Sequence, residues 1–249
     1  MKAICVIPAR YGSKRFPGKP LASDTGKPLI QHCYEAAARA RRVDAVLVAT
    51  DDDRIRDAVE AFGGRCVMTS PDHPCGTNRV AEAAEACADA DVVINFQGDE
   101  PELDPSLLDA LVRTLEANPA MQAATLAGPL DPEEWDDPNA VKVVMDARGD
   151  ALYFSRAPIP HARDGEDGRV APRLKHFGIY AYRAEALRDY AVLPPSPLER
   201  TERLEQLRWL EDGRRMFVLV TDAHPGGVDT PEDYAAFVRR YRDASNPEP

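Results

Sequence analysis

The sequence has little of what marks secreted, membrane-spanning or nucleic-acid-binding proteins. It has 5 cysteines in 249 residues, an odd number without a CxxC pair, so neither a disulfide framework nor a zinc site is indicated. No apolar run approaches the roughly 20 residues that a membrane helix needs, and the N-terminus has no signal-peptide pattern. Acidic residues outnumber basic residues and give a formal net charge of −11, which argues against a surface that binds nucleic acid or an anionic membrane. We therefore expect a cytoplasmic protein that keeps its cysteines reduced.

The first half of the chain alternates between short apolar runs and segments with helical periodicity. An apolar fraction of 44% supplies enough material for the core of one large α/β domain. Strands are predicted at 2–9, 44–51, 65–69 and 91–101, and helices at 27–42, 54–64, 76–90 and 104–119. This alternation predicts a mostly parallel sheet covered on both faces, which binds its ligands beyond the carboxyl ends of the strands.

The pattern becomes less regular after about residue 120. We predict strands or a hairpin at 140–146 and 150–160, a polar loop at 162–172, a strand at 174–183, one amphipathic helix at 197–213, a strand at 215–222 and a closing helix at 230–244.

A cationic loop, PARYGSKRFPGKPL at residues 8–21, follows the first predicted strand. Its four cations are Arg10, Lys14, Arg15 and Lys19. Glycines and positive charge suit a phosphate-binding loop, although a solvated basic loop is the alternative. The loop is not an NTPase P-loop, because five residues separate Gly12 from Gly18 and Pro20 follows Lys19. The hydroxyl that would hold magnesium is missing, so a metal would have to be bound elsewhere.

Two acidic segments offer metal ligands. QGDEP, residues 97–101, ends an apolar strand and directs Asp99 into the expected cleft, and VDTPED places Asp229 just before the closing helix. Mg²⁺ is held by one or two carboxylates together with substrate oxygens. Asp229 has an alternative role as the N-cap of that helix. Glu100 is a weaker candidate ligand, and Asp233 is expected to compensate the helix dipole.

Seven motifs in order carry a family resemblance. They are IPARYGSKRFPGKPL, GTNRVAEA, NFQGDEP, ALYFSRAPIP, KHFGIYAYR, SPLERTERLEQLR and GVDTPEDY. From about residue 2 to residue 240 the chain closely resembles the 3-deoxy-manno-octulosonate cytidylyltransferases. The resemblance implies an α/β, Rossmann-like nucleotide-diphospho-sugar transferase fold, with a mostly parallel sheet and a smaller sugar-binding and dimerisation subdomain. It further implies a homodimer and a single domain over 1–249. The nucleotide and metal core would lie at about 1–120 and 212–243, and the sugar-binding and dimerisation part at about 121–211.

The activity implied by the resemblance is a nucleotidyl transfer. CMP passes from CTP to the anomeric C2 hydroxyl of 3-deoxy-D-manno-octulosonate (Kdo) with Mg²⁺, giving CMP-Kdo and pyrophosphate for lipopolysaccharide precursor synthesis. The implied catalytic residues are Lys19, Asp99, Arg10 and Arg15, with Lys19 neutralising charge at the α-phosphate and at the leaving pyrophosphate. Asp99 and Asp229 would hold the metal. The implied CTP contacts are Arg10, Gly12, Ser13, Lys14, Arg15, Lys19, Gly76 and Thr77, and the implied Kdo contacts are Arg79, Gln97, Arg156, His176, Tyr180, Glu205 and Gln206.

The sequence departs from the family pattern beside GTNR. Asn78 stands where the family usually has an acidic residue, and Cys75 replaces the usual serine. A thiol forms a weaker hydrogen bond than a hydroxyl, and a lost carboxylate can change substrate choice. A related ulosonic acid such as an 8-amino-Kdo therefore remains an alternative substrate. A catalytically silent, nucleotide-binding homologue is a second alternative.

Overall fold

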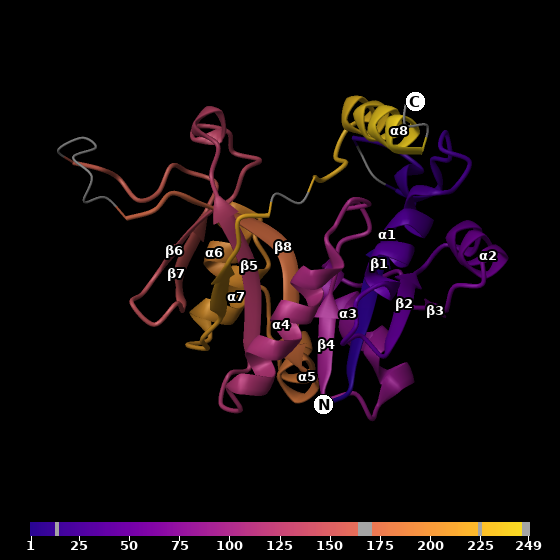
Figure 1. The fold of residues 1–249 in the computed structure, drawn as a ribbon. Helices are drawn as coiled ribbons and strands as arrows, with labels where there is room; N and C mark the ends of the chain where they lie inside the picture. Colours follow the sequence, from indigo (N-terminus) through magenta and orange to yellow (C-terminus); the bar gives the residue numbers. More distant parts are fainter. Residues whose placement is uncertain (13–14, 164–170, 224–225, 246–249) are drawn as a thin grey trace. The chain divides into compact units, whose positions relative to one another are not determined.

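The structure is a computed structural model that describes residues 1–12, 15–163, 171–223 and 226–245 (Figure 1). The chain divides into two compact units. Unit 1 comprises Met1–Ala110 and Pro225–Pro249, and unit 2 comprises Leu111–His224. Helix α4 (Pro105–Ala117) begins in unit 1 and ends in unit 2. The predicted division into a nucleotide core and a sugar-binding part assigns functions to segments of the chain, which the two compact units do not test, so it stays a prediction.

Unit 1 is built on four parallel strands in the order β3-β2-β1-β4. Its elements are β1 (Ala3–Ala9), α1 (Leu29–Ala38), β2 (Ala45–Thr50), α2 (Asp53–Ala61), β3 (Cys66–Met68), α3 (Gly76–Ala84), β4 (Val92–Asn95) and α8 (Pro231–Ser245), with short 3-10 helices at Lys19–Leu21 and Glu85–Cys87. The predicted parallel sheet is therefore confirmed in this unit. Because β1 lies between β2 and β4, nearly all its side chains are buried, which explains its apolar sequence.

The C-terminal helix returns to unit 1. Side chains of α8 pack in one core cluster with the start of α1; its buried members are Leu29, Val228, Tyr234, Phe237 and Val238. Phe16 of the cationic loop is packed against the same cluster. The cationic loop and the segment before α8 thus meet in space, although Lys19 and Val228 are 209 residues apart in sequence.

Unit 2 is mainly antiparallel. Its elements are β5 (Ala123–Pro129), β6 (Lys142–Met145), β7 (Ala151–Ser155), β8 (Leu174–Arg183), α5 (Ala184–Val192), α6 (Pro197–Glu202), α7 (Gln206–Glu211) and β9 (Phe217–Val220), with a 3-10 helix at Pro132–Glu134. Strand β8 pairs with β5 and β6, β6 pairs with β7, and β5 pairs in parallel with β9. A bridge between Asp150 and Phe217 joins the start of β7 to β9, so the pairings form a closed circuit.

The structure of unit 2 differs from the sequence analysis by two missed elements and one wrong prediction. The sequence analysis missed β5 and α5, and it predicted a single helix at 197–213 where the structure has two. The break lies at Arg203, whose φ of 56° is left-handed and ends α6. This single backbone turn lets Leu204, Leu207 and Trp209 all be buried, and helical periodicity alone does not reveal it.

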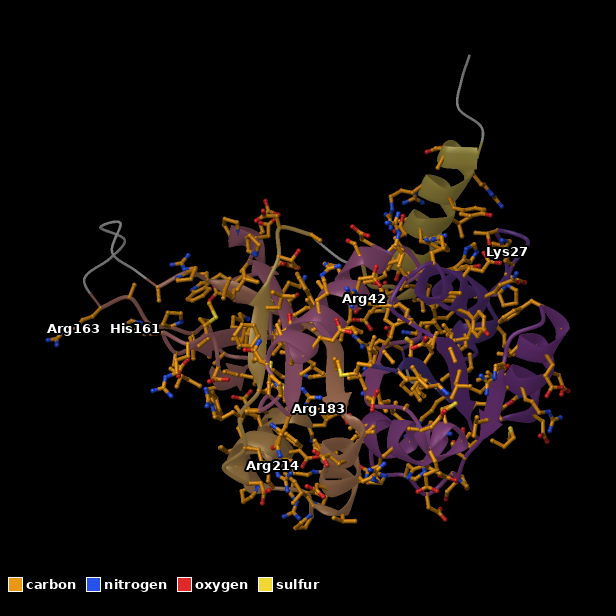
Figure 2. All side chains as sticks on the ribbon, turned by 60° about the horizontal axis from the view of Figure 1, so that its bottom comes forward. Lys27, Arg42, His161, Arg163, Arg183 and Arg214 are labelled. Atoms are coloured by element: carbon orange, nitrogen blue, oxygen red, sulfur yellow. The ribbon has the colours of Figure 1, made fainter. Side chains whose placement is uncertain are left out.

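The end of α4 is fixed by an arginine (Figure 2). Arg183, the last residue of β8, donates from Nη2 to the carbonyl of Leu115 (2.8 Å) and from Nε to that of Met121 (2.9 Å). A cation at a helix carboxyl end satisfies carbonyls that have no helical partner. Among the residues that the structure describes, no helix is both long and apolar enough to cross a lipid bilayer.

Candidate active site

A pocket of about 280 Å³ opens in unit 1 at the carboxyl ends of β1 and β4. Five predicted site residues line it, namely Arg10, Lys19, Gly76, Gln97 and Asp99. The other lining residues are Pro8, Ala9, Pro20 and Gly98. A Cβ at Gly98 would lie 3.3 Å from atoms of Ile7, Pro8 and Ile30, so a glycine lets this loop lie directly against β1. The pocket lies where parallel sheets bind their ligands.

Lys19 is the central cation of this pocket. Its Nζ donates to Asp99 Oδ2 at 2.7 Å and to the carbonyl of Val228 at 2.9 Å, and its side chain is only 12% exposed. The amide of Val228 in turn donates to the carbonyl of Asp99 at 2.8 Å. Gly18, with φ of 72°, turns the chain so that Lys19 opens a short 3-10 helix at the pocket.

Asp229 faces the cationic loop and does not cap the closing helix. Its Oδ1 accepts from Arg15 Nη2 at 2.8 Å. The helix is capped by Thr230, whose Oγ1 accepts from the amide of Asp233, while the Asp233 carboxylate accepts from the amides of Thr230 and Asp229. Burial raises the pKa of Asp233, but these hydrogen bonds outweigh it and hold the pKa below its usual value. The N-cap alternative for Asp229 is therefore not the one seen.

Helix α3 is fastened to the strands beside the pocket. Thr77 is buried, and its Oγ1 accepts from Asn95 Nδ2 of β4 at 3.0 Å. Arg79 is fully buried, and its guanidinium donates to Thr69 Oγ1 at 2.7 Å and lies 2.9 Å from Asp51 Oδ2. These contacts fix the first turn of the helix, and Gly76 at its start reaches the pocket.

Cys75 and Asn78, the two residues that depart from the family pattern, contact each other. The Cys75 thiol donates to Asn78 Oδ1 at 2.9 Å, and Asn78 is buried. In the loop before them, the carbonyl of His73 accepts from Arg10 Nη2 at 2.8 Å. Gly12 is exposed and does not line the pocket, whereas Ser13 and Lys14 lie outside the described residues. Glu100 is buried directly beside Asp99.

The other predicted sugar contacts belong to unit 2. His176 and Tyr180 lie on β8, Arg156 follows β7, and Glu205 and Gln206 lie at the start of α7. His176 Nε2 shares a hydrogen bond of 2.9 Å with Thr125 Oγ1, and the ring packs edge-on against Phe154. Burial lowers the pKa of His176 to about 3. Gln206 is 2% exposed, and its Nε2 has no hydrogen-bond partner among residues 1–12, 15–163, 171–223 and 226–245.

Comparison with known proteins assigns the family. The cytidylyltransferase family profile matches residues 4–216. The 3-deoxy-manno-octulosonate cytidylyltransferase of Nitratidesulfovibrio vulgaris is 52% identical over 96% of this chain and 95% of its own length. That of an Anaeromyxobacter species is 54% identical over 92% of each chain. This chain belongs to the 3-deoxy-manno-octulosonate cytidylyltransferase family. It is a nucleotidyltransferase enzyme of mixed α/β fold.

Solved structures agree with this assignment. A CMP:2-keto-3-deoxy-manno-octonic acid synthetase complexed with CTP superimposes with a TM-score of 0.92 at 45% identity, covering 98% of this chain and 100% of the other. A cytidylyltransferase from Leptospira borgpetersenii is 17% identical with a TM-score of 0.64 and shows the shared fold alone.

The residues of unit 1 fit a magnesium ion. Asp99 and Asp229 have side chains 30% and 49% exposed, so each carboxylate can be reached by a ligand. Their chain segments are joined through the Val228 amide and the Asp99 carbonyl. In the described part of the enzyme no three His, Cys, Asp or Glu side chains gather as a metal cluster. Two hard carboxylates completed by substrate oxygens and water are what Mg²⁺ uses in such sites.

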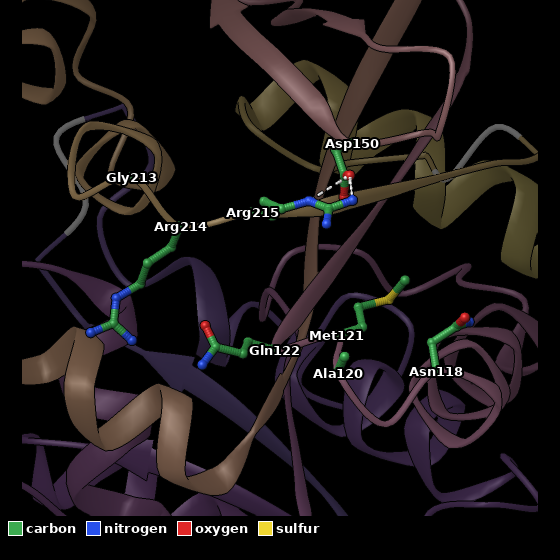
Figure 3. Close-up of a pocket in the computed structure, with 8 residues that line it drawn as sticks. All are labelled: Asn118, Ala120, Met121, Gln122, Asp150, Gly213, Arg214 and Arg215. Carbon is green, nitrogen blue, oxygen red and sulfur yellow. Dashed lines mark hydrogen bonds and ion pairs between the residues drawn. The ribbon is translucent and has the colours of Figure 1, made fainter.

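A second pocket, of about 380 Å³, lies in unit 2 near the start of β5 (Figure 3). It is lined by Asn118, Ala120, Met121, Gln122, Asp150, Gly213, Arg214 and Arg215. None of the predicted site residues is among them. Asp150 precedes β7 and pairs with Arg215, whereas the predicted contact Arg156 follows the other end of β7.

The sequence analysis missed two charged residues in unit 2. Lys142 is fully buried at the start of β6, and Glu202 ends α6 with its carboxylate against β7. A lysine within the apolar run AVKVVMD was the available signal for the first. No sequence signal distinguishes Glu202 from its acidic neighbours.

Proposed function

We propose that the enzyme transfers CMP from CTP to the C2 hydroxyl of Kdo, releasing pyrophosphate. The observation that carries the proposal is the pocket of unit 1, in which Arg10, Lys19 and Asp99 meet at the strand ends. The C2 oxygen forms a bond to the α-phosphorus, the bond from that phosphorus to the pyrophosphate oxygen breaks, and the hydroxyl proton leaves to solvent. This chemistry needs positioning and charge stabilisation more than covalent catalysis.

In this proposal the cations of the 8–21 loop bind the triphosphate. Lys19 is largely buried and already holds a carboxylate, so its ammonium is fixed before substrate arrives. A preorganised cation stabilises charge that develops on the α-phosphate and the leaving group without reorganising during the reaction. Arg10 and Arg15 add charge from the same loop, and the start of α3 at Gly76 presents backbone amides.

Asp99 and Asp229 are proposed to hold Mg²⁺. When bound, the ion would supply Lewis-acid activation of the C2 hydroxyl and neutralise phosphate charge. Lys19 and Arg15 form ion pairs with Asp99 and Asp229, and these cations would have to release the carboxylates for the ion to bind. No histidine is among the residues described as lining this pocket, and the proposal assigns no general base.

Unit 2 is proposed to carry sugar contacts. Gln206 supports this most directly, because its buried amide nitrogen lacks a protein partner in the described structure and can donate to a sugar hydroxyl. His176, with its lowered pKa, is neutral at physiological pH and would bind the sugar by hydrogen bonding rather than by charge. Arg79 is fully buried and bonded within unit 1, so its predicted sugar contact has the least support. A homodimer, a cytoplasmic location and a role in lipopolysaccharide precursor synthesis remain predictions from the family resemblance.

The test is pyrophosphate release from CTP and Mg²⁺ with Kdo, with 8-amino-Kdo, and without sugar. We expect release with Kdo that depends on Mg²⁺. The Asp99→Asn variant should lose this turnover while still folding, and near-normal activity would remove Asp99 from the metal site. Release with the amino sugar alone would keep the chemistry and change the substrate. CTP binding without release with either sugar would mark a catalytically silent homologue.

A further inference from the structure

The peptide of Arg156 is held by two charged side chains. Strand β7 ends at Ser155, so the backbone of Arg156 lies beyond the end of the strand. Its amide donates to Glu202 Oε2 at 3.0 Å, and its carbonyl accepts from Lys142 Nζ at 3.1 Å. Backbone groups at a strand end usually turn to water or other backbone. Here the backbone of Arg156 is held between the carboxylate of Glu202 and the ammonium of Lys142, an arrangement that we call the bracket.

Lys142 is a buried cation whose hydrogen bonds go to backbone carbonyls. Its side chain is 0% exposed, and burial lowers its pKa. Its Nζ donates to the carbonyls of Asp137 (2.6 Å) and Arg156, and in the described structure it forms no ion pair. Burying an ammonium costs free energy that two carbonyls only partly offset. A hydrophobic residue would fill this strand position at lower cost, so the contribution of the ammonium to the structure lies in the two carbonyls that it holds.

Glu202 completes the bracket from the other side. Its carboxylate also accepts from Ser155 Oγ at 2.6 Å, and its own carbonyl accepts from Arg156 Nε at 2.7 Å. Arg156 Nη1 reaches the carbonyl of Pro138 at 2.8 Å. Three separate segments, around residues 137, 156 and 202, are therefore locked together.

This junction leads directly into the predicted sugar contacts. The next residue after Glu202 is Arg203, in the strained left-handed conformation, and Glu205 and Gln206 follow at the start of α7. A non-glycine residue keeps such a conformation only when its surroundings enforce it. The hydrogen bonds from Arg156 to the carbonyls of Glu202 and Arg203 (3.4 Å for the latter) provide this restraint.

We propose that Lys142 and Glu202 are positioning residues for the sugar substrate, which bracket the Arg156 peptide and thereby place Arg156 and the start of α7. The proposal rests on the proposed function, because the effect is read through binding of the ulosonic acid. It assigns neither residue a contact with substrate. Loss of the bracket should weaken sugar binding and leave the CTP pocket of unit 1 unchanged.

Lys142→Met in the full-length enzyme tests the bracket, and Lys175→Met is its matched control. Lys175 lies opposite Lys142 in the β6–β8 register, but its ammonium pairs with Glu134 instead of holding the Arg156 peptide. We expect Lys142→Met to raise KM for Kdo about tenfold, with KM for CTP changed less than about twofold. Lys175→Met should change neither constant. An equal rise in both constants, or no rise, would overturn the proposal.

Glu202 provides a second pair of variants should Lys142→Met fail to fold. Glu202→Gln keeps a side-chain oxygen for the Arg156 amide and should retain most sugar affinity, whereas Glu202→Ala should lose it. Amide hydrogen exchange tests the bracket without relying on the identity of the sugar substrate. Exchange at the Arg156 amide should accelerate about tenfold or more in Glu202→Ala, whichever sugar the wild type uses. Unchanged exchange there would refute the bracket even if Kdo is the substrate, and absent wild-type turnover with Kdo would refute only the function.

Discussion

Acidification from pH 7 to pH 5 should destabilise the enzyme through His176. This side chain is buried against Phe154 and Tyr180 and shares a hydrogen bond with Thr125 Oγ1. Burial penalises the imidazolium and lowers the pKa from 6.5 to about 3. The unfolded chain therefore binds a proton at His176 between those values and the folded chain does not. Because the unfolded state binds more protons in this window, stability falls as the pH falls from about 6.5 towards 3.

The magnitude follows from the two pKa values. Linkage gives a loss of about 2 kcal/mol in the free energy of unfolding between pH 7 and pH 5 from this residue alone. His176→Gln removes the titration and retains a nitrogen that can reach Thr125. Urea unfolding of both proteins at pH 7, 6 and 5 measures the difference. The wild type should lose about 2 kcal/mol more than the variant over this range. Equal losses would show that the imidazole is protonated in the folded state and would refute the reasoning.

The remaining predictions concern unit 1. Lys19→Ala should lower kcat/KM by about 10²–10³-fold and lower the melting temperature less than Arg79→Met does, because the Asp99 carboxylate that it leaves is 30% exposed and can be hydrated; a larger drop in melting temperature would instead mark Lys19 as structural. Asn78→Asp should improve turnover with Kdo if this position tunes the substrate pocket, and an unchanged substrate profile in the pyrophosphate assay would discard that role. Arg79→Met should lower the melting temperature, because it leaves Asp51 without its buried partner; a stable variant with a raised KM for Kdo alone would restore Arg79 as a sugar contact.

The sequence predicted unit 1 well because its signals are local. Each strand of a parallel sheet covered on both faces is a continuous apolar run, and each intervening helix repeats its apolar residues every three to four positions. All four strands and the main helices of this unit were therefore found, with errors mainly at their ends. The cationic loop and Asp99 could be assigned to one site for the same reason, since both follow predicted strands of a parallel sheet. The structure adds that these strands, β1 and β4, are parallel neighbours.

Unit 2 was predicted less well because its structure depends on distant contacts. Strand β5 holds small residues and ends in GP, so its sequence carries little strand signal, and its place is set by pairing with β8 and β9. The break at Arg203 is held by hydrogen bonds from Arg156, 47 residues earlier. A local pattern cannot contain a restraint that is formed only when the two segments meet.

The sequence by itself determined the family, the parallel sheet of the first strands and the cationic loop with its acidic counterpart, because these features lie in contiguous motifs. Only the tertiary structure decided which charged side chains are paired with each other. It paired Lys19 with Asp99 and Arg15 with Asp229, left the helix cap to Thr230, and buried Arg79 against Thr69. It also placed Lys142 beside the Arg156 peptide. The physical reason is that the residue type sets the charge of a side chain, whereas its partner and its burial depend on which segments the folded chain brings together.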